Sequence, residues 1–258
     1  MLNLYNNIFD THSHYDDEAF DADRDELISS MLSGSVSYII HASTDEASSR
    51  YGIEYSQKYE NYYTSIGFHP ENLDTLPDDY IALLGQLLNC SNKIVAVGEI
   101  GLDYHYDGYD SEKQKEVFEN QLIFANEHNL PVIIHCRDAT EDAMSIIRKH
   151  RPKGVMHCFS GSAETATELI SLGMYIGFTG VLTFKNAKKA VRAIDAIPLD
   201  RILFETDCPY MAPDIFRGER SDSTMIERNA IKASEIKGIS VQDMLNCVCD
   251  NARTLFSI

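Results

Sequence analysis

The sequence lacks the features that would divide the chain or anchor it in a membrane. It has no Pro-rich, Gly/Ser-rich or low-complexity stretch that would indicate a linker between domains. No apolar run approaches the roughly 20 residues needed to cross a bilayer. Residues 1–10 have neither the basic start nor the long apolar segment of a secretory signal. We therefore expect the 258 residues, 1–258, to form a single domain that works in the cytoplasm without a membrane.

Basic residues and paired cysteines are also scarce. The chain has 22 Lys and Arg against 40 Asp and Glu, a net charge of −18, which favours solubility and repels long polyanions. No basic groove for nucleic acid is indicated. The six cysteines form no CxxC pair, which predicts reduced thiols in a reducing compartment. Cys136 and Cys158 each follow a histidine, so strand alternation predicts that both thiols point away from those histidines, toward surrounding helices.

Eight short runs are rich in β-branched and aliphatic residues, a composition typical of strands that are buried on both faces of a parallel sheet. They lie at residues 8–12, 37–41, 62–67, 94–98, 132–135, 154–157, 174–178 and 202–205. Helical patterns separate them. Strand and helix alternation with eight repeats predicts an α/β fold, a (β/α)8 TIM-type barrel, and leaves a doubly wound open sheet as the alternative.

Helix boundaries are indicated by capping residues. Ser111 with Gln114 resembles a capping box at the start of one helix. Gly34 and Gly173 follow two shorter helical stripes and suit left-handed C-caps. Ser240 can cap a last helix, which we expect to close the outer ring of the barrel.

Residues of the types that bind metal ions, His, Glu and Asp, follow several of the apolar runs. His12 and His14 are one residue apart, so in an extended strand both imidazoles face the same side while Ser13 turns away. Four later runs lead into Glu99, His135, His157 and Asp207. In a barrel the carboxyl ends of all strands converge on one mouth, which an open sheet does not require. The pattern predicts a site for one or two divalent metal ions, and a mixed imidazole and carboxylate set accepts Mg, Zn, Mn, Ni or Fe.

Six motifs together resemble those of the TatD family of metal-dependent deoxyribonucleases. They occupy residues 10–14 (DTHSH), 67–70 (GFHP), 98–103 (GEIGLD), 135–139 (HCRDA), 157–161 (HCFSG) and 205–209 (ETDCP), in the family's order. The ending at residues 251–256 is also similar, so the resemblance covers nearly the whole chain. One segment departs from it. The family typically has an Arg-x-Asn-x-Pro-like sequence where this chain reads RGERSDS, residues 217–223, so the family's substrate contacts do not carry over there.

The resemblance implies a distorted barrel of the amidohydrolase type with one or two divalent ions. Carried over by position, one ion would be held by His12, His14 and Asp207 and the second by His135 and His157, with Glu99 as the bridge. Two divalent ions bring +4 and the two carboxylates −2, so the pocket would be cationic and would attract a phosphate.

Further residues have roles that follow from their positions. Asp207 is the candidate general base, since a carboxylate on the metal is within reach of the attacking water. Glu99 is a candidate catalytic residue as well as a candidate ligand. Glu205, two residues before Asp207, is expected to orient it, with a structural ion pair as the alternative. His69, in the Gly-x-His-Pro motif, is expected to face the substrate or donate a proton; the alternative is a hydrogen bond that fixes its loop.

Two residues are candidates for binding substrate. Arg137 can meet a phosphate with its planar guanidinium, unless it only pairs with Asp138. Tyr104 lies in a loop with Tyr106 and Tyr109, where a tyrosine can stack on a base. Packing within the protein is the alternative for these tyrosines.

The predicted function is a metal-dependent hydrolase of phosphodiester bonds in DNA, specifically a 3′-5′ exodeoxyribonuclease; this polarity is implied by the resemblance alone. The acidic charge predicts a preference for single-stranded ends as the nucleic acid partner, and no obligate protein partner is indicated. An amidohydrolase or ester hydrolase, such as a D-aminoacyl-tRNA deacylase, can use the same dinuclear site. A non-enzymatic scaffold is the remaining alternative.

Overall fold

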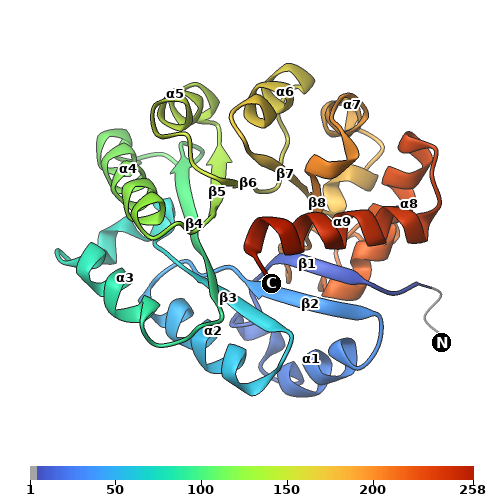
Figure 1. Ribbon diagram of the computed structural model, residues 1–258, viewed down its shortest axis with the longest axis horizontal. Helices are drawn as coiled ribbons and strands as arrows, with labels where there is room; N and C mark the ends of the chain where they lie inside the picture. The colour runs from blue at the N-terminus through green and yellow to red at the C-terminus, as the bar shows by residue number, and fades with distance from the viewer. Residues whose placement is uncertain (1–4) are drawn as a thin grey trace.

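The computed structural model describes residues 5–258 and contains a single sheet of eight parallel strands (Figure 1). Each strand pairs with its neighbour in chain order, from β1 to β8. The strands are β1 Ile8–Ser13, β2 Val36–His41, β3 Tyr62–Ile66, β4 Ile94–Asp103, β5 Val132–Arg137, β6 Gly154–Met156, β7 Tyr175–Phe178 and β8 Ile202–Phe204. The predicted (β/α)8 barrel is confirmed, and the open sheet is excluded because β1 also meets the segment after β8.

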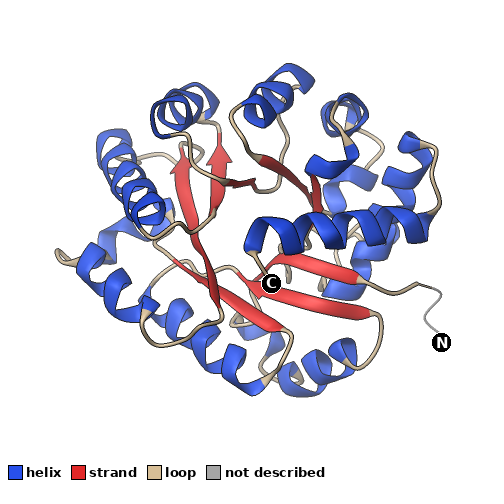
Figure 2. Cartoon of the chain, in the orientation of Figure 1, coloured by secondary structure: helices blue, strands red, loops and turns tan. Residues whose placement is uncertain are grey.

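Helices surround the strands (Figure 2). They are α1 Arg24–Leu32, α2 Glu46–Lys58, α3 Tyr80–Leu88, α4 Ser111–Glu127, α5 Thr140–His150, α6 Ala163–Ser171, α7 Lys188–Ala196, α8 Ile226–Lys237 and α9 Val241–Phe256. A large apolar core lies between this layer and the sheet. Within residues 5–258 no helix combines the length and the apolar composition that a membrane span requires.

The seam between β1 and β8 is the distorted part of the barrel. Instead of a continuous ladder there is one isolated parallel bridge, between Ser13 and Cys208. The backbone N–H of Asp207 adds a hydrogen bond to the carbonyl of His12, at 3.0 Å. The seam therefore closes next to the predicted ligands. It holds His12, the first of them in the chain, beside Asp207, the last.

The last helix joins the outer ring only with its first half, where Met244, Leu245 and Val248 lie in the core between helices and sheet. Ser240 caps α9 as predicted, accepting from the N–H of Asp243. However, Ala252, Leu255 and Phe256 of α9 pack on side chains at the amino ends of the strands, among them Phe9. Figure 1 shows α9 crossing in front of the strands. The helix covers the amino-terminal opening of the barrel, because that end exposes apolar side chains which would otherwise meet water.

Two predicted caps are wrong. Asp110, not Ser111, caps α4, and the side chain of Gln114 binds the backbone of Asp103 instead of completing a capping box. Gly34 is not in a left-handed conformation, since α1 already ends at Leu32 in a right-handed turn. Gly173 does have a positive φ, 96°, as a left-handed C-cap requires.

Strand β4 is longer than the predicted run at residues 94–98. An irregularity in its pairing with β5 lies between Val97 and Ile100, after which the ladder continues to Asp103 opposite Arg137. Glu99 is therefore inside β4 rather than beyond its end. The extension also brings Asp103 into the barrel mouth.

Candidate metal centre

The structure brings all six predicted ligands together at the carboxyl-terminal mouth of the barrel. One group of donors surrounds the Oε2 atom of Glu99. The Nε2 atom of His12 lies 3.2 Å from this oxygen and the Nε2 atom of His14 lies 3.7 Å from it. Asp207 completes the group, with Oδ1 at 3.2 Å from Nε2 of His14 and at 3.6 Å from Nε2 of His12. Alternation along β1 thus places both histidines on one side, as predicted.

A second group surrounds the other carboxylate oxygen of Glu99. The Nδ1 atom of His135 lies 2.9 Å from Oε1, and the Nε2 atom of His157 lies 3.7 Å from it. His69 joins this group, with its Nε2 atom 3.5 Å from the same oxygen. Glu99 therefore has one oxygen in each group, which is the geometry that a bridging ligand requires.

The spacing of these donors fits a divalent ion. Ligands about 2.1 Å from a tetrahedral ion are separated from one another by roughly 3.4 Å. The separations between the Glu99 oxygens and the imidazole nitrogens of the two groups, 2.9–3.7 Å, lie near this value, and imidazole with carboxylate is a donor set that Zn, Mn, Fe or Ni accepts. Each group supplies three or four donors, so an ion that takes five or six ligands would keep positions for water and substrate, as a catalytic site needs.

The carboxylates of the site are ionised. Burial alone would raise the pKa of Glu99, but the charges of His12, His69 and His157 outweigh it and hold that pKa well below its usual range. The pKa of Asp207 is also lowered: burial opposes the shift, and the hydrogen bond with His14 and neighbouring imidazoles produce it. Both carboxylates are thus negatively charged at neutral pH and can bind a cation.

Three of the imidazoles hold protons in the metal-free protein. Burial lowers the pKa of each, but carboxylates overcome it and raise the pKa of His14 to about 9, of His135 to about 10 and of His157 to about 8. Burial, together with the nearby charge of His157, lowers the pKa of His12. Without metal, protons on these imidazoles supply the positive charge beside the carboxylates. A metal ion must displace those protons in order to bind.

Asp103 is a further functional candidate, which the pattern of apolar runs did not indicate. Its Oδ2 atom lies 2.9 Å from Nε2 of His135, on the opposite side of the ring from Glu99. Gln114 holds the backbone of Asp103 through two hydrogen bonds. A carboxylate behind a ligand histidine fixes the ring and its tautomer. The available signal was the carboxylate four residues after Glu99 in the GEIGLD motif.

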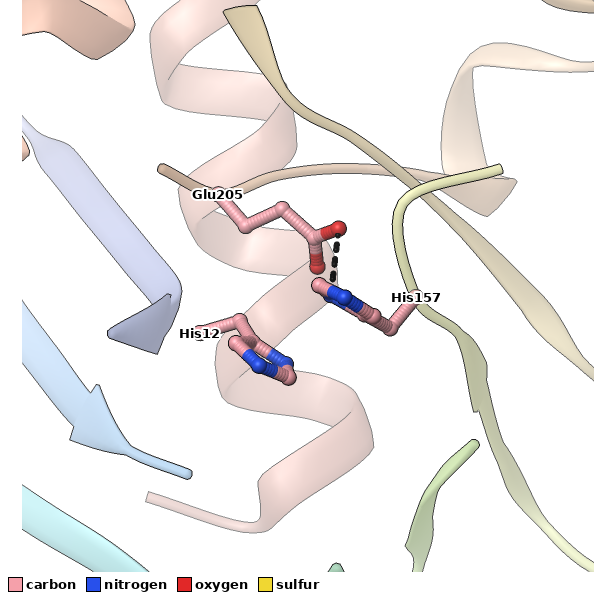
Figure 3. Close-up of side chains that lie close together, drawn as sticks. All are labelled: His12, His157 and Glu205. Carbon is pink, nitrogen blue, oxygen red and sulfur yellow. Dashed lines mark ion pairs between the residues drawn. The ribbon is translucent and has the colours of Figure 1, made fainter. Parts of the chain in front are cut away.

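Glu205 lies beside the imidazoles of His12 and His157 (Figure 3). Its Oε1 atom is 3.0 Å from Nδ1 of His157 and accepts a hydrogen bond from the backbone N–H of Cys158. The contact with His157 has the distance of an ion pair but not the alignment of a hydrogen bond. The rings of His12 and His157 stack, with centroids 3.6 Å apart. Glu205 thus supports the histidine ring from the side away from Glu99.

Cys158 does not point away from the site as expected. Its φ of 44° lies in the left-handed region, which interrupts strand alternation and turns the thiol toward the mouth. The Sγ atom lies within 4.8 Å of donor atoms of His157 and Asp207. Burial raises the pKa of this thiol, so it is protonated at neutral pH. Cys136 packs against the apolar core, as expected, and also borders the cavity.

A buried carboxylate at the seam positions the ligands of β1 and of the segment after β8. Asp10 accepts hydrogen bonds from the N–H of Thr206 at 3.0 Å, from its hydroxyl at 2.6 Å and from the hydroxyl of Ser223 at 2.7 Å. Burial raises the pKa of Asp10 to about 7, against the lowering effect of these bonds. The sequence signal was a charged residue inside an apolar run.

An open cavity of about 820 Å³ lies above the two donor groups. Arg137 lines it and is the only Lys or Arg among the lining residues. Tyr106 and Tyr210 also line it, whereas Tyr104 does not: the Tyr104 ring stacks on Tyr109 and its hydroxyl donates to Asp142. The tyrosine loop therefore faces the cavity through Tyr106 rather than through Tyr104.

The divergent segment at residues 217–223 does not line the cavity. Arg220 pairs with Asp23 at 2.7 Å, and the Arg217 guanidinium lies over the ring of Phe184. These two contacts tie the loop after β8 to the rest of the barrel.

Comparisons with known proteins agree with this geometry. The sequence profile of the family described as TatD related DNase matches residues 9–257. YabD of Bacillus subtilis, described as an uncharacterized metal-dependent hydrolase, is 39% identical over 97% of this chain and 99% of its own. A Cronobacter sakazakii protein named 3′-5′ ssDNA/RNA exonuclease TatD is 33% identical over 80% of each chain.

A solved structure is similar as well. The crystal structure of YJJV, a TatD homologue from Escherichia coli, covers all of both chains with a TM-score of 0.93 at 30% identity. The chain therefore belongs to the family of TatD-related DNases and is a hydrolase.

Proposed function

We propose that this protein uses one or two divalent ions to hydrolyse phosphodiester bonds at the single-stranded 3′ ends of DNA. The observation that carries the proposal is the position of Glu99, which has one carboxylate oxygen in each of two donor groups. His12, His14, Asp207, His135 and His157 would hold such ions together with Glu99, and the ions would supply positive charge for the attacking and the leaving oxygen of an in-line displacement at phosphorus. The nuclease name of the Cronobacter relative supports the choice of bond and of direction.

The charges around the cavity favour an end over a long duplex. Two ions would bring +4 against the −2 of their carboxylate ligands Glu99 and Asp207, so a phosphate oxygen would be attracted to the open coordination positions. The rim carries the carboxylates of Asp16, Asp17 and Glu71, which repel further phosphates. The proposal includes a cytoplasmic location, where the six unpaired thiols stay reduced.

Each neighbouring side chain has a role in this proposal. Asp207 accepts the proton of the attacking water, and Arg137 holds a nonbridging phosphate oxygen. His69, within 3.5 Å of Glu99 and on the cavity wall, donates a proton to the leaving oxygen. Glu205 keeps the His157 ring in place.

The test replaces the base without changing its shape. We expect Asp207→Asn to reduce hydrolysis of a single-stranded 3′ end by about 10²-fold or more, as loss of a general base does, while circular dichroism stays unchanged. Asp107→Asn, an exposed carboxylate in the loop after β4, is the control. A near-wild-type rate for Asp207→Asn with metal still bound would reject this role.

A second experiment tests the preference for single strands. At low salt, the rate on short single strands should exceed that on long duplex DNA, because the rim repels a polyanion. Equal rates on the two substrates would contradict the preference but not the hydrolysis.

One observation favours a second candidate, hydrolysis of an aminoacyl ester such as that of a D-aminoacyl-tRNA. Asp16 and Asp17 line the cavity beside His14, where they could bind a cationic α-amino group, which DNA lacks. A panel of phosphodiesters and D-aminoacyl esters separates the candidates. Turnover of the esters alone would replace the nuclease proposal.

A further inference from the structure

Exposed large apolar side chains are concentrated at the mouth of the barrel. Among residues 5–258 six such side chains are exposed, and five of them lie on the loops that follow β4 and β8. They are Tyr106, Tyr109, Tyr210, Met211 and Ile215. Exposed apolar groups that gather beside a cavity mark a binding surface, whereas scattered ones do not.

Two of these side chains are tyrosines on the cavity wall. Tyr106 and Tyr210 are each 57% exposed, and both line the cavity. Tyr210 is three residues beyond Asp207, and Tyr106 is three residues beyond Asp103, so the two rings flank the donor groups from different strands. A flat, exposed ring next to a reacting phosphate offers its face to a base.

Both rings are held in place by neighbours. The hydroxyl of Tyr210 donates to Asp17 at 2.9 Å. The guanidinium of Arg137 lies 5.2 Å from the ring centre of Tyr106 and contacts its hydroxyl at 3.4 Å. Rings that are already ordered lose little entropy when a base stacks on them.

The charges beside the two rings differ in sign. Arg137 lies at Tyr106, and a phosphate is stabilised there. Asp17 lies at Tyr210, with Asp16 next to it in the chain, and a phosphate is repelled there. A strand can therefore continue past Tyr106, but it must end at Tyr210.

We propose that Tyr210 stacks on the terminal base and Tyr106 on the next base, with the strand leaving over Arg137. This rests on the proposed nuclease function and adds the subsites that hold the substrate. Because every base has an aromatic face, the two platforms bind single strands without reading their sequence. A duplex is excluded, since its paired bases are not free to stack on a protein ring.

The test measures stacking at each position separately. A single strand with a phosphorothioate as its last linkage carries 2-aminopurine either at the 3′ end or at the next position, and its fluorescence is followed on binding to metal-loaded protein. We expect Tyr210→Leu to remove the quenching of the terminal probe only and Tyr106→Leu that of the second probe only. Each should weaken binding by about 5- to 150-fold, the range for loss of one stacked base.

Phenylalanine variants and Tyr109→Leu are the controls. Phenylalanine keeps the ring, so Tyr106→Phe and Tyr210→Phe should retain quenching. Tyr109 is exposed in the same loop but does not line the cavity, so Tyr109→Leu should bind normally. All variants should bind Mn²⁺ with the wild-type affinity in isothermal titration, and the leucine variants should raise KM for the strand more than they lower kcat.

The outcomes separate this inference from the proposed function. Leucine variants that bind and quench like the wild type, or quenching that is lost equally in the phenylalanine variants, would overturn the inference even if the strand is hydrolysed. If Tyr210→Leu removed quenching of the second probe and Tyr106→Leu that of the terminal probe, the assignment of the chain end to Tyr210 would be wrong. Position-specific quenching in a protein that hydrolyses no phosphodiester would uphold the subsites and reject the nuclease.

Discussion

Replacement of Asp103 by asparagine tests how the second donor group is built. Oδ2 of Asp103 faces Nε2 of His135 at 2.9 Å, and Oδ1 accepts the backbone N–H of His105 at 2.9 Å. In Asp103→Asn the remaining oxygen keeps the bond to His105, so the amide NH2 turns toward His135. A donor at that position requires Nε2 to be unprotonated, which moves the proton to Nδ1. That nitrogen is the one that faces Glu99 and the proposed second ion.

The size of the effect follows from the contact that is lost. Removal of a hydrogen-bond partner behind a ligand histidine lowers metal affinity by about 10- to 100-fold, or roughly 1.4–2.7 kcal/mol. The hydrogen bonds and ion pairs that the described residues form with the Asp103 side chain involve His135 and His105 and none of the first donor group, so that group should keep its affinity. The variant should therefore weaken the binding of only one of the two metal ions.

Isothermal titration of metal-stripped protein with Mn²⁺ measures both steps. We expect one step to match the wild type and the other to weaken by about 10- to 100-fold. Asp138→Asn is the matched control, because Asp138 pairs with His105 at 2.8 Å, a histidine outside the donor groups. Equal weakening of both steps, or no change in either, would refute the argument from the tautomer, and unchanged circular dichroism excludes unfolding as the cause.

Two other predictions concern protons and backbone space. The raised pKa values of His14, about 9, and His135, about 10, mean that metal binding at pH 7 releases protons and strengthens as the pH rises toward 10. Titration in buffers of different ionisation enthalpy should show this release; identical heats would contradict it. Gly101→Ala should lower Tm by at least about 4 °C, since the new Cβ would lie 1.9 Å from the His135 carbonyl oxygen at a φ of 147°. Gly173→Ala has a positive φ but open space, so a Tm loss as large in this control would show that strain alone, not the contact, is responsible.

That the six candidate ligands meet at one place was predictable because it depends on regular geometry. A period of two along β1 places His12 and His14 on one face, and parallel strands in a closed barrel bring their carboxyl ends to one mouth. Glu99 and Asp207 follow apolar runs whose composition alone indicates buried strands. These relations need no knowledge of how particular side chains pack.

Residues that depend on departures from regular geometry were not predictable. Asp103 joins the site because β4 continues past an irregularity at Glu99, and Gln114 then holds the strand instead of capping α4. The thiol of Cys158 faces the mouth because its backbone is left-handed. Such features depend on contacts between segments far apart in the chain, so a local sequence pattern cannot predict them.

The sequence by itself determined the eight strands, their parallel order and which candidate ligands meet at the mouth, because each follows from local periodicity and from the type of side chain. Only the tertiary structure decided which nitrogen of His135 faces Glu99, that α9 closes the amino-terminal opening, and that Tyr106 and Tyr210 rather than Tyr104 border the cavity. The reason is physical: alternation fixes the side of a strand on which a residue lies, whereas ring orientation, helix docking and loop path depend on packing and hydrogen bonds across the whole barrel.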